Sequence, residues 1–101
     1  MKIQINDGQT ITVTGLVELA AANAAQVRDD IRAKLTPAHS ALEIDLSQVT
    51  FLDSSGLGAL ISLQKTLRSQ NGTVRLINPA TNVRQILELT RLHRVFEIVQ
   101  R

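Results

Sequence analysis

Residues 51–60 read FLDSSGLGAL, and they carry more information about this chain than any other segment. An apolar, strand-like run ends at Asp53, two serines and a glycine follow, and a helical apolar pattern begins after them. This order predicts a turn from a strand into a helix, with two hydroxyl groups at its mouth. The amino end of a helix carries partial positive charge and free N–H donors, so the turn favours an anion or an added phosphate.

The serine turn has a structural and a functional interpretation. In the structural one, Ser54 or Ser55 is the N-cap of the helix, a bond worth about 1 kcal/mol, and Gly56 and Gly58 let the helix start lie close to the sheet. In the functional one, a phosphate adds roughly two negative charges beside Asp53. That charge would leave the fold intact and abolish a contact with a docked partner.

Alternating and buried apolar residues predict the strands. Residues 2–6 and 10–14 alternate, and Asp7-Gly8 between them is typical of a hairpin turn. Leu42, Ile44 and Leu46 predict a buried strand over 41–46. Further extended segments are expected over 49–52, 73–77 and 96–99.

Three helices are expected between these strands. The first covers 18–35, with Leu19, Ala22, Val27, Ile31 and Leu35 as its apolar stripe, and Pro37 stops it. The second covers 56–69 and ends at Asn71-Gly72 in a left-handed cap. The third covers 81–90, capped by Thr81 or Asn82. The resulting order β-β-α-β-α-β-α-β implies a mostly parallel sheet with an antiparallel hairpin at its edge.

Length and composition limit the class of protein. The chain has 101 residues, which fits one domain over 1–101, and it lacks cysteine, which excludes disulfides, thiolate catalysis and cysteine-based zinc sites. Lys2 precedes an alternating segment rather than the apolar run of a signal peptide, and no stretch approaches the length of a membrane span. We therefore expect a cytoplasmic protein without membrane insertion.

Charge is unevenly distributed along the chain. Residues 1–63 carry a net charge of −3, and residues 64–101 carry +5. A basic tail can bind nucleic acid or lipid head groups. We favour a solvated surface and no direct nucleic-acid binding, because the basic residues are spread over several elements without aromatic partners. They are Lys65, Arg68, Arg75, Arg84, Arg91 and Arg94.

Motifs for enzymatic chemistry are missing. Gly56-Leu57-Gly58 lacks the spacing and the lysine of a phosphate-binding loop, and Ser55 has Asp53 where a hydrolase elbow needs glycine. His39 and His93 are expected at the surface, and Asp45 is expected to end a strand and accept backbone N–H bonds. We predict no catalytic residue, no cofactor and no metal site.

The hexapeptide Asp53-Ser54-Ser55-Gly56-Leu57-Gly58 resembles the signature of the STAS domain of bacterial anti-sigma factor antagonists. Weaker matches follow in the same order along nearly the whole chain: Gly15 before a helix, the strand over 42–46, Asn71-Gly72, the strand over 74–77 and the segment 87–92 before Phe96. The resemblance implies a STAS-like α/β fold. Its sheet would be four- to five-stranded, mixed and mostly parallel, with an N-terminal antiparallel hairpin and about three to four helices.

The resemblance also implies a function in transcription regulation by partner switching. Members of the family bind an anti-sigma factor that is also a serine kinase, of the GHKL ATPase type, and so free the sigma factor. The kinase phosphorylates the serine after the aspartate, which is Ser54 here, with Ser55 as the runner-up. A metal-dependent, PP2C-type phosphatase reverses the modification.

The implied partner-binding residues are Glu18, Asp53, Ser54, Ser55, Gly56, Leu57 and Gly58. Glu18 stands where the family often has an aspartate, and alanine replaces a common threonine in the same loop. An alternative function is a subunit of a lipid-transport ABC complex, a role that some short STAS proteins have. In that role the same turn would dock on an ATPase without being phosphorylated.

Overall fold

The computed structural model describes all 101 residues and contains a mixed five-stranded sheet with the strand order β1-β2-β4-β6-β7. Its strands are β1 (Lys2–Asn6), β2 (Thr10–Thr14), β4 (Ala41–Asp45), β6 (Thr73–Ile77) and β7 (Glu97–Val99). Only β1 is antiparallel to its neighbour, so the predicted hairpin and mostly parallel sheet are confirmed. A separate parallel pair is formed by β3 (Glu18–Leu19) and β5 (Phe51–Leu52).

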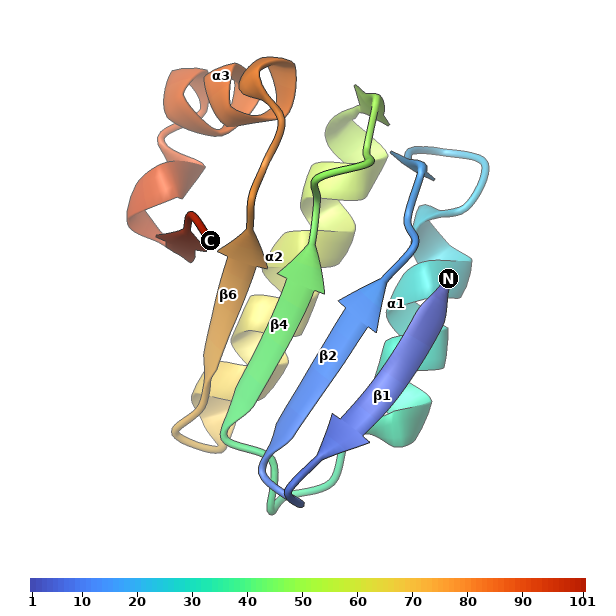
Figure 1. Cartoon of the computed structure of the whole chain (residues 1–101), viewed down its shortest axis with the longest axis vertical. Helices are drawn as coiled ribbons and strands as arrows, with labels where there is room; N and C mark the ends of the chain where they lie inside the picture. Colours follow the sequence, from blue (N-terminus) through green and yellow to red (C-terminus); the bar gives the residue numbers. More distant parts are fainter.

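Two helices, α1 (Ala24–Lys34) and α2 (Ser54–Ser69), cover one face of the sheet, and α3 (Thr81–Leu89) lies beyond the carboxyl end of β6 (Figure 1). The core fills the space between this face and the helices. On the sheet side it contains alternate residues of β2, β4 and β6, all at most 1% exposed: Ile11, Val13, Leu42, Ile44, Val74 and Leu76. The predicted burial of Leu42 and Ile44 is therefore confirmed.

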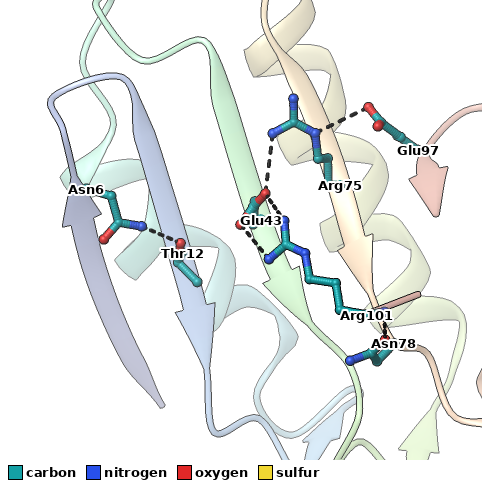
Figure 2. A network of polar contacts seen from close by, with 7 residues as sticks. All are labelled: Asn6, Thr12, Glu43, Arg75, Asn78, Glu97 and Arg101. Carbon is teal, nitrogen blue, oxygen red and sulfur yellow. Dashed lines mark hydrogen bonds and ion pairs between the residues drawn. The ribbon is translucent and has the colours of Figure 1, made fainter. Parts of the chain in front are cut away.

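No helix lies over the opposite face of the sheet (Figure 1). At its centre Glu43 is only 8% exposed because two guanidinium groups lie over it. Arg75 Nη1 donates to Glu43 Oε2 at 3.3 Å, and Arg101 Nη2 donates to the same oxygen at 2.8 Å. Figure 2 shows how this network continues from Arg75 to Glu97 on β7. The Glu43 carboxylate thus links three strands and the last residue of the chain, and it raises the pKa of Arg101.

Replacing Glu43 by glutamine should lower the free energy of unfolding by about 1–2 kcal/mol, because charge-assisted bonds to two guanidinium groups are weakened. Glu97→Gln is the matched control, since the Glu97 side chain is 54% exposed and pairs only with Arg75. We expect its effect to stay within about 0.5 kcal/mol. Urea denaturation of both variants measures the difference, and equal effects would contradict a supporting role for the buried carboxylate.

The helix predicted over 18–35 is wrong in its first six residues. Glu18 and Leu19 form β3 and pair with Phe51 and Leu52, and α1 begins only at Ala24. The Asn23 side chain stabilises the turn between them: its Oδ1 accepts from Ala20 N at 2.9 Å, and its Nδ2 donates to Glu18 O at 2.8 Å. Distant backbone pairing therefore overrides the helix propensity of this alanine-rich segment.

Smaller differences concern caps and histidines. The N-cap of α3 is Ala80 rather than Thr81 or Asn82, and the Asn82 amide instead donates to Thr50 O. His39, expected at the surface, is 3% exposed, and its Nδ1 accepts from the Thr36 amide at 2.9 Å. Asn71 has the predicted left-handed conformation after α2, with φ 59°.

Candidate functional site

The turn before α2 is capped by Asp53, not by either serine. Asp53 Oδ1 accepts a hydrogen bond from Gly56 N at 3.0 Å, and the helix begins at Ser54. The N-cap role predicted for Ser54 or Ser55 is therefore wrong, because the helix starts two residues earlier than its apolar pattern. Neither serine side chain is therefore needed to cap the helix.

The same carboxylate connects the turn to a second loop. Asp53 Oδ2 accepts from Ala21 N at 3.0 Å, and Asp53 N donates to Leu19 O at 3.4 Å. The segment after β3 is thereby tied to the start of α2. The Gly56 and Ala21 amides, which donate to the charged form, lower the pKa of Asp53 below its ordinary value of 3.8.

The lowered pKa predicts a pH dependence of stability. The hydrogen bonds to ionised Asp53 exist only in the folded chain, so they add to the free energy of unfolding. This stabilisation is fully present above the pKa that Asp53 has in the unfolded chain. It is lost as the pH falls through the lower pKa of the folded chain. Asp53→Asn keeps an N-cap oxygen without a titrating proton. We expect the free energy of unfolding, measured with urea from about pH 7 to about pH 2, to fall less in the variant than in the wild type. Parallel pH profiles would contradict this role of the carboxylate.

Ser54 and Ser55 occupy the first two positions of α2, and both are exposed. Their hydroxyl groups make no hydrogen bond within the chain. Ser54 thus presents a free hydroxyl to solvent at the positive end of a 16-residue helix. An added phosphate at this position would meet the partial positive charge of the helix start, where Asp53 already accepts from the Gly56 amide, rather than packed side chains.

The two glycines after the serines differ in their surroundings. A Cβ atom on Gly56 would lie 2.0 Å from Leu19 O and 2.7 Å from Leu52 Cδ1, so only glycine lets α2 start against β3 and β5. Around Gly58 nothing lies within 4 Å of the corresponding position, so the close approach predicted for this residue is wrong. Leu57 between them is half-buried and packs against the core.

Two exposed apolar residues beside the turn were missed by the sequence reasoning. Phe51 is 57% exposed and Val17 is 60% exposed. Phe51 is paired with Glu18, which is also exposed, and Val17 directly precedes that residue. We use the name switch surface for six exposed residues that lie in or next to β3, β5 and the first turns of α2: Val17, Glu18, Phe51, Ser54, Ser55 and Gly58.

Hollows in the molecular surface lie elsewhere. One of about 620 Å³ is lined by Arg84, Glu88, His93 and Ile98, and none of the switch-surface residues contributes to it. No group of three or more His, Asp or Glu side chains is gathered where it could hold a metal ion. The switch surface thus has no hollow, and it presents hydroxyl, carboxylate and apolar groups. Such a surface suits a protein partner rather than a small molecule.

Comparison with known proteins places similar sequences in one family. The family model described as the STAS domain matches residues 2–101. The chain is also 26% identical over 98 residues to an anti-sigma-B factor antagonist of Listeria monocytogenes, which covers 97% of this chain and 86% of that protein.

Solved structures give the same fold. A Thermotoga maritima protein named as a candidate anti-sigma factor antagonist is 25% identical with a TM-score of 0.89, over 99% of this chain and 85% of that chain. Unphosphorylated SpoIIAA, an anti-sigma factor antagonist, is 21% identical with a TM-score of 0.86, over 99% of this chain and 86% of that chain. SpoIIAA of Bacillus has also been solved in a phosphorylated form, with a TM-score of 0.74 to this chain.

Proposed function

This chain belongs to the STAS domain family, and we propose that it is an anti-sigma factor antagonist whose docking on its partner is controlled by phosphorylation of Ser54. The observation that carries the proposal is the free hydroxyl of Ser54 at the first position of α2, inside the switch surface. The names of similar proteins support an anti-sigma factor as the partner.

Phosphorylation of Ser54 would act on docking rather than on folding. The phosphate adds roughly two negative charges and strong acceptor oxygens, and the partial positive charge of a helix start tolerates them. A partner that has to exclude water from Phe51 and Val17 would instead meet a desolvated dianion next to Asp53. Like charges brought together at an interface cost several kcal/mol, so the complex would dissociate.

The partner that phosphorylates Ser54 is proposed to be a serine kinase of the GHKL ATPase type that also binds a sigma factor. The unphosphorylated chain would occupy the kinase and release the sigma factor in the cytoplasm. A PP2C-type phosphatase would remove the phosphate and restore docking. The chain's own role is that of a binding module, with the exposed residues Glu18, Ser55 and Gly58 completing the contact and the buried Gly56 supporting the turn. None of the helices combines the length and the apolar character that a membrane-spanning segment requires.

Incubation of the chain with the cognate kinase and ATP tests the proposal. We expect intact-mass spectrometry to detect the addition of one phosphate, absent from Ser54→Ala and retained in the control Ser55→Ala. Transfer that persists in Ser54→Ala would overturn the assignment. Absence of transfer together with copurification of an ABC-transporter ATPase would favour the constitutive transport role instead.

A further inference from the structure

The outer edge of the main sheet carries unpaired backbone groups on β1. The direction of the backbone groups alternates along β2. Ala41 N, at the start of β4, donates to Gln9 O, so the N–H and C=O groups of the odd-numbered residues of β2 point toward β4. Those of the even-numbered residues therefore point toward β1. The even-numbered residues of β1 lie opposite those of β2 and form its hydrogen-bonded pairs. The N–H and C=O groups of Ile3 and Ile5 therefore point away from the sheet.

This edge lacks the features that usually protect an edge strand from pairing. All five residues of β1 are in regular register with β2, without a bulge or a proline, and Lys2 is the only charged side chain. Ile5 is 57% exposed. In Figure 1 no strand lies alongside the outer edge of β1, although α1 is visible behind it, and the edge strand β7 on the other side is shorter, with three residues.

We propose that β1 pairs antiparallel with β1 of a second copy of this chain, with Gln4 on the two-fold axis. In this register Ile3 lies opposite Ile5 of the second copy, and each such pair exchanges two backbone hydrogen bonds, about four in total. Both isoleucines are on the helix-covered side of the sheet, so the exposed Ile5 gains an apolar neighbour. Lys2 lies opposite Asn6, and no two like charges face each other.

Pairing of this kind would extend the sheet across both molecules without closing the switch surface. The two copies run in opposite directions along the shared edge, so their switch surfaces lie at opposite ends of the joined sheet. Neither surface includes a residue of β1. Each copy of the dimer could therefore dock its own partner, which would favour bivalent partners by raising the effective concentration of the second contact.

Sedimentation equilibrium of the full chain tests the dimer. One strand gives a small interface, so we expect the average mass to rise from 11.1 kDa toward twice that value as the concentration increases from about 10 μM to about 1 mM. Ile5→Pro removes an outward-pointing N–H and leaves the bonds to β2 intact, and it should weaken association about tenfold or more. Leu89→Lys, which changes an 84% exposed side chain on α3, is the control and should have no effect.

Amide hydrogen exchange of the wild type gives a second readout that needs no variant. The Ile3 and Ile5 amides should exchange more slowly as the concentration rises, whereas other exposed amides should not change. A chain that stays monomeric at about 1 mM, or an association that Leu89→Lys removes and Ile5→Pro does not, would overturn the proposal. A monomer whose β1 amides are protected only by another protein's strand would also overturn it, in favour of that partner.

Discussion

Ser54→Asp should unfold at nearly the same urea concentration as the wild type and yet fail to bind the anti-sigma factor. Aspartate at the first position of a helix interacts favourably with the positive helix end, so we expect the free energy of unfolding to change by about 0.5 kcal/mol or less. The same carboxylate placed in a closed interface beside Asp53 should weaken binding about a hundredfold or more.

Two further variants show whether the position of the charge matters. Ser54→Ala should bind as the wild type does, because the free hydroxyl makes no bond within the chain. Gln85→Glu adds one negative charge at an exposed position of α3, outside the switch surface, and should leave affinity unchanged. If Ser54→Asp binds normally in isothermal titration, a negative charge at this position does not control docking.

Gly56→Ala should cause the largest loss of stability of any single methyl group added to this turn. The new Cβ would lie 2.0 Å from a backbone oxygen of β3, which cannot move away without breaking the β3–β5 pair. We expect a decrease of about 3 kcal/mol or more in the free energy of unfolding. The start of α2 would also be displaced from β3, so partner binding should fall together with stability.

Gly58→Ala is the matched control for this substitution. The position is exposed, nothing lies near the added methyl group, and alanine is favoured over glycine inside a helix. We expect this variant to be more stable than the wild type by about 0.5–1 kcal/mol. Urea denaturation measures both, and a Gly56→Ala protein as stable as the wild type would mean that α2 does not start against β3.

The main sheet could be predicted from the sequence because its signals are local. Alternation over 2–6 and 10–14 with Asp7-Gly8 between them specifies a hairpin, and the buried strands separated by helices specify parallel crossovers. The segment 18–23 could not be predicted in this way. Its alanines favour a helix locally, while the β3–β5 pair depends on residues more than thirty positions away.

The chemistry of the candidate site was predictable in kind, but its geometry was not. Asp, Ser and Gly residues indicate a helix start, and Asp53, Ser54 and Ser55 are all good N-caps. Asp53, which caps, also accepts from the Ala21 amide 32 positions away, a contact that the local sequence does not indicate. Phe51 was missed for a similar reason. Val49 N donates to Leu46 O in a turn, so the segment before Phe51 is not a continuous strand. The alternation of buried and exposed side chains along a strand therefore could not be used to predict which way Phe51 points.

One titration tests the switch most directly: the affinity of the anti-sigma factor kinase for this chain before phosphorylation, after it, and after removal of the phosphate by a PP2C-type phosphatase. We predict tight binding, loss of binding and restored binding, with one phosphate at Ser54 and an unchanged unfolding temperature throughout. Equal affinity of the phosphorylated and unphosphorylated chains, or a lost affinity explained by a lowered unfolding temperature, would contradict a surface switch at the start of α2.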